Sequence, residues 1–81
     1  MTIKAIMFCK FNMYATSKIL EKLQELPEIK KLMSLTGDYD AIAEIEVENS
    51  DDLYDIFTKK IDLIDGIIDT NTHVVMKSWE K

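Results

Sequence analysis

The sequence predicts an α+β fold, a two-layer sandwich in which two helices cover one face of a four-stranded antiparallel sheet. A strand, helix, strand pattern occurs twice along the 81 residues. The connection between the two middle strands, residues 37–40, is so short that they must form an antiparallel hairpin. Pro27 and Gly66 stand where the two helices are expected to end. The element order is therefore βαββαβ.

The first strand is expected at residues 2–11, where apolar side chains occupy both alternating sets of positions. This pattern is typical of a central strand that is buried on both faces. In residues 14–26 the apolar side chains recur at helical spacing, opposite a face of lysines and glutamates. The first helix should end at Pro27, since proline disfavours helical backbone at the residue before it.

The hairpin strands are expected at residues 29–36 and 41–47. In the second of these, small or apolar residues alternate with a largely acidic set, so one face should be buried and the other more polar. The buried set is Ala41, Ala43, Ile45 and Val47, and the other set is Ile42, Glu44, Glu46 and Glu48.

The second helix should be capped by Asn49 or Ser50, because both side chains can accept a backbone N–H at a helix start. Asp51 and Asp52 in its first turn are favourably placed against the helix dipole, which explains them better than acid-base chemistry does. Gly66 should close this helix. Its apolar stripe is Leu53, Ile56, Phe57, Ile61 and Ile64.

The last strand is expected to be long, at residues 67–79. Right-handed crossovers then give the ferredoxin-like sheet order 4-1-3-2. In this topology the turn at 37–40 and the start of the last strand lie at the same end of the sheet, two strand spacings or about 10 Å apart. One small ligand would reach both only with help from a neighbouring loop or another subunit.

The sheet face away from the helices should carry large apolar side chains, which a monomer would leave in water. We therefore expect two protomers to pack sheet against sheet as a symmetric dimer, an assembly of the dimeric α+β barrel type. The expected residues of this face are Ile6, Phe8, Leu32, Ile42 and either Val75 with Trp79 or Val74 with Met76.

Composition excludes several classes of function. The formal net charge is -5 and the sequence contains no arginine, which argues against direct nucleic-acid binding. No stretch is long and apolar enough to span a bilayer, and Cys9 is the single cysteine, so we expect a cytoplasmic protein outside the membrane. With His73 as the only histidine, a zinc site within one subunit is nearly excluded, and we expect no metal or cofactor.

The run LTGDYD at residues 35–40 holds groups suited to binding a free amino acid. An α-amino acid presents an ammonium, which needs a carboxylate, and a carboxylate, which needs N–H or O–H donors. Taken alone, the turn is most simply a plain hairpin connection, and an exposed Thr-x-Thr pattern is usually a strand edge. The candidate ligand-binding residues are Gly37, Asp38, Tyr39, Asp40, Thr70 and Thr72.

Three segments in this order, together with the terminal Lys81, resemble a known module over essentially the whole chain. The segments are LPEI at 26–29, LTGDYD at 35–40 and TNTHVV at 70–75. The chain resembles the C-terminal effector domain of the Lrp/AsnC family of transcriptional regulators, called the regulation-of-amino-acid-metabolism (RAM) domain.

The resemblance implies a ferredoxin-like domain that dimerises through its sheet, with dimers assembling into octamers or related rings. Amino acids bind between dimers, near the glycine-acid turn. By this resemblance Gly37, Tyr39 and Asp40 match the turn of the family, and Thr70 and Thr72 match the threonines that open its last strand. The remaining turn residue, Asp38, occupies a variable place in that motif.

One departure from the family pattern shapes the expected function. Family regulators carry an N-terminal helix-turn-helix, whereas this chain begins directly with its first strand, so we expect a single effector domain over residues 1–81 without a DNA-binding domain. The expected function is a non-enzymatic, oligomeric amino-acid sensor, which could also co-assemble with full-length regulators of the family.

Two alternatives remain open at this point. One is a small dimeric α+β barrel enzyme, such as an oxygenase or isomerase, although one histidine and no arginine leave little catalytic equipment. The other is a regulatory domain of the ACT type, which shares the topology and differs in where its ligand sits.

Overall fold

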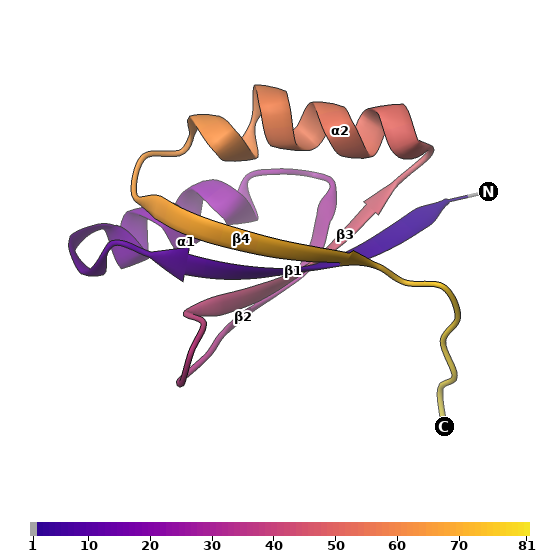
Figure 1. Ribbon diagram of the computed structural model, residues 1–81, viewed down its shortest axis with the longest axis horizontal. Coiled ribbons are helices and arrows are strands. Elements are labelled where there is room, and N and C mark those ends of the chain that lie inside the picture. The colour runs from indigo at the N-terminus through magenta and orange to yellow at the C-terminus, as the bar shows by residue number, and fades with distance from the viewer. Residues whose placement is uncertain (1) are drawn as a thin grey trace.

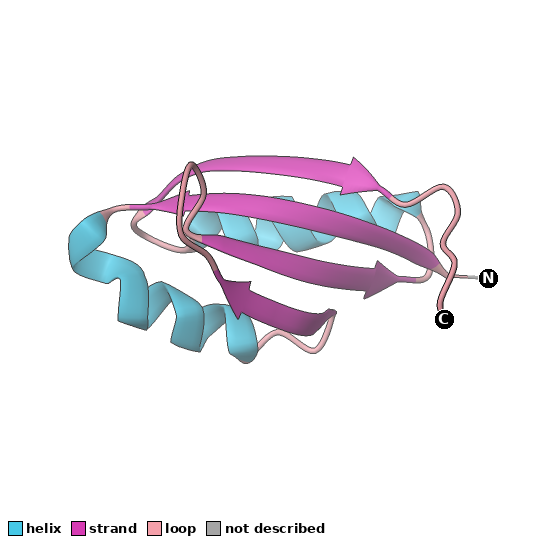
Figure 2. Cartoon of the chain, turned by 90° about the horizontal axis from the view of Figure 1, so that it is seen from below, coloured by secondary structure: helices cyan, strands magenta, loops and turns pink. Residues whose placement is uncertain are grey.

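The computed structural model describes residues 2–81 and has the predicted element order. The sheet order is β2-β3-β1-β4 with every neighbouring pair antiparallel, so the predicted order 4-1-3-2 is confirmed. Both helices lie on one side of the sheet (Figure 1), and Figure 2 views the molecule from the uncovered side. The elements are β1 (Ile3–Phe11), α1 (Thr16–Gln24), β2 (Ile29–Ser34), β3 (Ala41–Val47), α2 (Ser50–Lys59) and β4 (Ile67–Val74), with short 3₁₀ turns at Met13–Ala15 and Ile61–Leu63.

The core lies between the sheet and the helices. Alternate residues of β1 and β3 point into it, and the two helices close it with Ile19, Leu23 and Ile56. Each fully buried aliphatic side chain of this kind contributes about 1.5–3 kcal/mol relative to an exposed one. The buried strand residues are Ala5, Met7, Cys9, Phe11, Ala41, Ala43, Ile45 and Val47, which confirms the alternation predicted for residues 41–47.

The opposite side of the sheet, called the open face below, follows from the strand registers. Phe8 pairs with Ile42 on one side and Asn71 on the other, and all three point away from the helices. Cross-strand pairs of opposite charge, such as Lys4 with Glu46, lie at its ends. The open face consists of Lys4, Ile6, Phe8, Lys10, Lys31, Met33, Ile42, Glu44, Glu46, Asp69, Asn71 and His73.

Leu32 does not belong to the open face, contrary to expectation. It pairs with Ala43 and packs against the core, while Met33 takes the place on the open face opposite Ile42. The cause is a register shift in the β2–β3 pair between Ile29 and Lys31. A bulge of this kind moves every later side chain of the strand to the other face.

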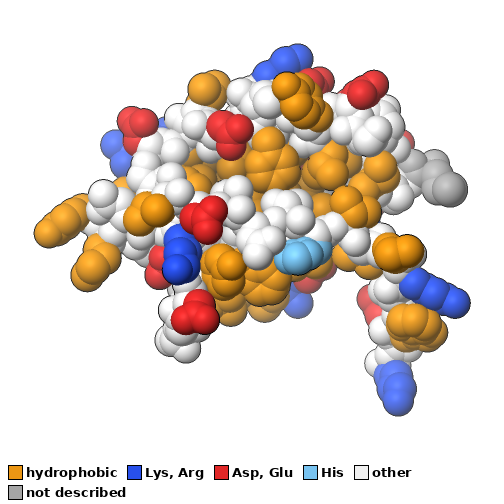
Figure 3. Space-filling model, in the orientation of Figure 1, with side chains coloured by type: hydrophobic (Ala, Val, Ile, Leu, Met, Phe, Trp, Pro, Cys, Tyr) orange, Lys and Arg blue, Asp and Glu red, His pale blue; other side chains and the backbone are white. Residues whose placement is uncertain are grey.

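The last strand is shorter than predicted, ending at Val74 and not at residue 79. Val74 lies opposite Ala5, close to the start of β1 at Ile3, so a strand continuing to Trp79 would have no neighbour to pair with. Val74 lies on the helix-covered side of the sheet, as its partner Ala5 does. The prediction that Val74 and Met76 lie on the open face is therefore wrong for Val74. Residues 75–81, called the arm below, extend away from the body of the molecule (Figure 3).

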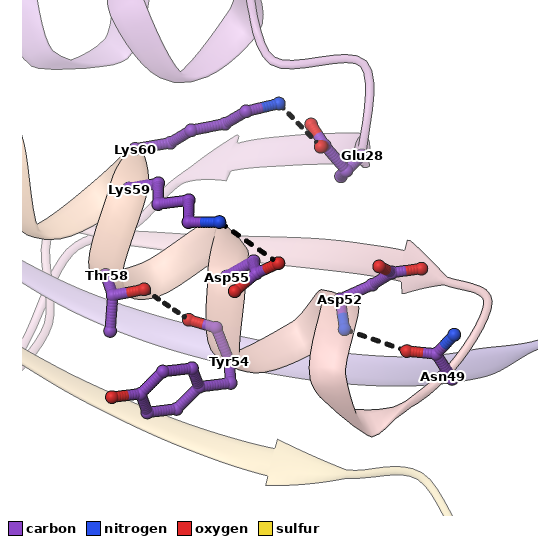
Figure 4. A network of polar contacts seen from close by, with 8 residues as sticks. All are labelled: Glu28, Asn49, Asp52, Tyr54, Asp55, Thr58, Lys59 and Lys60. Carbon is purple, nitrogen blue, oxygen red and sulfur yellow. Dashed lines mark hydrogen bonds and ion pairs between the residues drawn. The ribbon is translucent and has the colours of Figure 1, made fainter.

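Polar contacts fix both ends of α2 (Figure 4). Asn49 is the cap, and its Oδ1 accepts the backbone N–H of Asp52 at 2.9 Å. After the other end of the helix, Lys60 Nζ donates to Glu28 Oε2 at 2.6 Å, and this hydrogen bond lowers the pKa of Glu28. The second helix is thereby tied to the chain that enters β2.

Candidate functional site

The turn between β2 and β3 is closed by one hydrogen bond and held against the end of β1 by two others. Within the turn, Leu35 N–H donates to the Asp40 carbonyl at 2.8 Å. Asp40 N–H donates to the Cys9 carbonyl, and the Phe11 N–H donates to Asp40 Oδ2, both at 2.8 Å. One oxygen of the Asp40 carboxylate therefore has a structural role, which the sequence alone did not reveal.

Gly37 and Asp38 form the exposed tip of this turn. Gly37 has φ +102°, and a Cβ built on it would meet no atom within 4 Å. Glycine is needed there for its backbone conformation and not for space. Backbone and carboxylate groups at the tip are thus accessible to a ligand or to another subunit.

Tyr39 points from the turn across the open face. Its ring packs on Phe8 with centroids 5.3 Å apart, and Lys10 Nζ lies 5.8 Å from the centroid of the Tyr39 ring. Asn71 Nδ2 donates to Tyr39 Oη at 3.2 Å. The Tyr39 side chain therefore spans the two strand spacings that separate the turn from β4.

Thr70 and Thr72 lie on the other face of the sheet from Tyr39. Cys9 pairs with both Ala41 and Thr70, so the turn and the start of β4 do share one end of the sheet, as predicted. Because Cys9 and Met7 point into the core, their partners Thr70 and Thr72 lie on the helix-covered side, half-buried at the free edge of β4. Thr70 lines a recess of about 310 Å³ there. The six predicted site residues thus fall into two groups that a single chain does not bring together.

Two residues of β4 that contact Tyr39 or Phe8 were not among the predicted site residues. Asn71 and His73 alternate with the threonines and lie on the open face, where His73 meets Phe8 edge to face at a centroid distance of 6.2 Å. The signal that could have found them is the pairing of β4 with β1. Once Met7 and Cys9 are assigned to the core, the residues that alternate with their β4 partners must face outward.

The groups around the turn are complementary in charge to the two ends of an amino acid. Asp38 is an exposed carboxylate suited to an ammonium group, and Lys10 supplies a cation for a carboxylate. Nucleophilic chemistry has less support, since burial raises the pKa of the Cys9 thiol to about 12 and keeps it protonated. Across residues 2–81, no group of three or more His, Cys, Asp or Glu side chains is arranged to hold a metal ion. None of the helices in that range is long and apolar enough to cross a membrane.

Comparison with known protein families matches residues 5–81 to the Lrp/AsnC ligand binding domain. Among curated proteins, the chain is 33% identical over 75 residues to the HTH-type transcriptional regulator FL11 of Pyrococcus furiosus, covering 93% of this chain and 49% of the regulator. It is also 30% identical over 69 residues to homocitrate synthase of Sulfurisphaera tokodaii, covering 85% of this chain and 15% of the enzyme. The chain thus spans about half the length of the regulator and a small part of the enzyme.

Solved structures agree on the fold. The crystal structure of FFRP-DM1 superposes with a TM-score of 0.87 at 27% identity, covering 91% of this chain and 99% of that one. A transcriptional regulator from Neisseria meningitidis, solved as a complex with L-Met, superposes with a TM-score of 0.89 over 98% of this chain and 53% of its own. At 15% identity the second likeness concerns the fold alone.

Proposed function

Since the chain belongs to the Lrp/AsnC ligand-binding domain family, we propose that it is a non-enzymatic, oligomer-forming module that binds a free α-amino acid. The observation that carries this proposal is the family match over residues 5–81, which includes the whole turn and both threonines. The charged groups of the turn are complementary to an amino acid, and a regulator of the same fold was solved with L-Met. We further propose that the protein acts in the cytoplasm.

The two curated relatives support a regulatory role over a catalytic one. One is a transcriptional regulator and the other is a biosynthetic enzyme, yet both share this one stretch of about 70 residues with the chain. The regulator and the enzyme share neither a DNA-binding function nor a catalysed reaction. A ligand-binding module that is combined with different functional parts accounts for both likenesses. In this role the chain could also co-assemble with full-length regulators of the family.

The binding site is proposed to lie between subunits. Gly37, Asp38, Tyr39 and Asp40 lie at the turn, whereas Thr70 and Thr72 lie on the helix-covered side of the β4 edge. A ligand that contacts both groups would take the turn from one subunit and the threonines from its neighbour. Such a ligand would stabilise the assembly, because it binds the associated subunits and not the separate ones. The subunits would dimerise through the open face, and dimers would form a ring.

Isothermal titration calorimetry against the twenty amino acids tests the proposal. Asp40→Asn is the sharpest variant, because its amide oxygen can still accept the Phe11 N–H while the charge is lost. We expect heat with at least one amino acid, and loss of that heat in Asp40→Asn. The matched control is Glu48→Gln, which removes one exposed charge just beyond the far end of β3 and should bind normally. No heat with any of the twenty would contradict the proposal.

A further inference from the structure

A groove of about 810 Å³, called the helix groove below, lies between α1 and the chain that links α2 to β4. Both segments belong to the side of the molecule that faces away from the open face (Figure 1). The proposed sheet-to-sheet dimer uses the open face, so the helix groove stays accessible in that dimer.

The base of the helix groove is apolar and firmly built. Asn12 N–H donates to the Gly66 carbonyl at 2.6 Å, which ties the chain before α1 to the chain before β4. A Cβ on Gly66 would lie 2.7 Å from Ala15 Cβ and 2.9 Å from Ile19 Cδ1, so the two segments touch directly there. A groove with such a base is already formed before a ligand arrives, which lowers the cost of binding.

Two large apolar side chains stand at the rim of the helix groove, one on each wall. Tyr14, from the 3₁₀ turn before α1, is 100% exposed, and Leu63, from the turn after α2, is 71% exposed. A small molecule on the base would leave both of them in water. A partner of the width of a helix would cover both, and tyrosine is enriched among the residues that anchor protein interfaces.

The helix groove is basic, although the chain as a whole is acidic with a formal net charge of -5. Lys18 and Lys22 lie one turn apart on α1, and neither forms a salt bridge within residues 2–81. Like charges at this spacing weaken a helix, so the fold itself does not account for them. The charged residues that line the groove are Lys18, Lys22, Lys59 and Lys60, against Glu25 and Asp65.

We propose that the helix groove is the docking site for an acidic amphipathic helix of a partner protein. The α1 wall, nine residues long, matches about two and a half turns of such a helix. Apolar side chains at i, i+3, i+4 and i+7 of the partner would fill the base, and carboxylates on its flanks would pair with Lys18 and Lys22. The partner would add a third helix to the helical layer. This docking site does not depend on the proposed amino-acid site, since the two share no residue.

A displayed library of helical peptides tests the proposal on the full chain. Every member carries leucines at i, i+3, i+4 and i+7 and glutamates or aspartates on both flanks, and the other positions are randomised. We expect selected peptides to bind with low-micromolar dissociation constants. In amide NMR spectra they should shift the signals of residues 14–26 and 59–66 and leave those of the open face unchanged. A library without binders, or binders that map to the open face, would overturn the proposal.

Charge reversal tests the role of the lysines. The double variant Lys18→Glu with Lys22→Glu should weaken the best peptide at least about 10-fold, because two attractions become repulsions. A peptide with lysines in place of its acidic residues should in turn bind this variant. The matched control is Lys77→Glu with Lys81→Glu on the arm, which makes the same charge change and should bind normally. Circular dichroism checks the fold of both variants, and equal binding by the reversed and the unmodified chain would contradict the proposal.

An anionic membrane surface is the other occupant that an apolar groove rimmed with lysines fits. Sedimentation with vesicles of phosphatidylcholine and phosphatidylserine tests it. We expect the full chain to stay in the supernatant. Sedimentation with the vesicles that is lost in the Lys18→Glu, Lys22→Glu variant would assign the groove to a lipid surface and overturn the partner helix.

Discussion

The Asp40 carboxylate should stabilise the fold as well as serve the site. The last residue pair between β1 and β3 is Cys9 with Ala41, and Phe11 lies beyond it. On the β3 side of the strand, the Phe11 N–H therefore has only Asp40 Oδ2 as a partner, at 2.8 Å. Removing a charged acceptor costs about 1.5–3 kcal/mol, and the half-buried position favours the lower part of that range. For a domain of this size, 1 kcal/mol corresponds to about 4–8 °C in Tm.

Asp40→Ala should therefore lower Tm by about 6–16 °C, while Asp40→Asn, which keeps an acceptor oxygen, should lose less than half as much. Thermal and urea unfolding followed by circular dichroism measure both losses. Protein concentration must be held fixed, because subunit association also contributes to stability. Equal losses for the two variants, or none for either, would refute the assigned role of the carboxylate.

Two further stability predictions follow from single contacts. Gly66→Ala should lower the free energy of unfolding by at least about 2 kcal/mol, because φ is +97° and the new Cβ would lie 2.7 Å from the Ala15 Cβ. Gly37→Ala should lower it by only about 1 kcal/mol, from backbone strain alone. Equal losses in urea unfolding would contradict this. Lys60→Gln should cost about 0.5–1 kcal/mol at neutral pH. Lys60 lowers the folded-state pKa of Glu28 below its ordinary value of 4.5. The loss of stability in Lys60→Gln should therefore be full above pH 4.5 and vanish as the pH falls through the folded-state pKa. A loss of stability that does not depend on pH would argue against the ion pair.

The parts of the fold that the sequence predicted correctly depend on local signals. The alternation in β3 and the cap at Asn49 each act within a few residues, and the element order then restricts the sheet to one topology. Gly66 does not close the second helix as predicted, because α2 ends at Lys59 and the 3₁₀ turn Ile61–Leu63 lies between the helix and the glycine. The other errors arose where the outcome depends on a neighbouring strand. The bulge in β2 decides the side of Leu32, and the start of β1 decides where β4 ends.

The same distinction holds for the site. The turn and the threonines were predicted to share one end of the sheet, and they do. Which face Thr70, Asn71 and Thr72 occupy depends on their pairing with β1, and the contact of Asn71 with Tyr39 depends on the reach of one side chain across that strand. Neither is visible in residue types or spacing alone.

A mixed oligomer tests the central claim, an amino-acid site shared between subunits, most directly. Asp40→Asn and Thr72→Val each remove one of the two groups, so neither variant alone should bind the amino acid identified with the unmodified chain. After unfolding and refolding them together in equal amounts, about one quarter of the sites should contain both intact groups, if subunits assemble at random. Calorimetry should then find about a quarter of the original stoichiometry with unchanged affinity. No binding in the mixture would place the site within one chain and contradict the account.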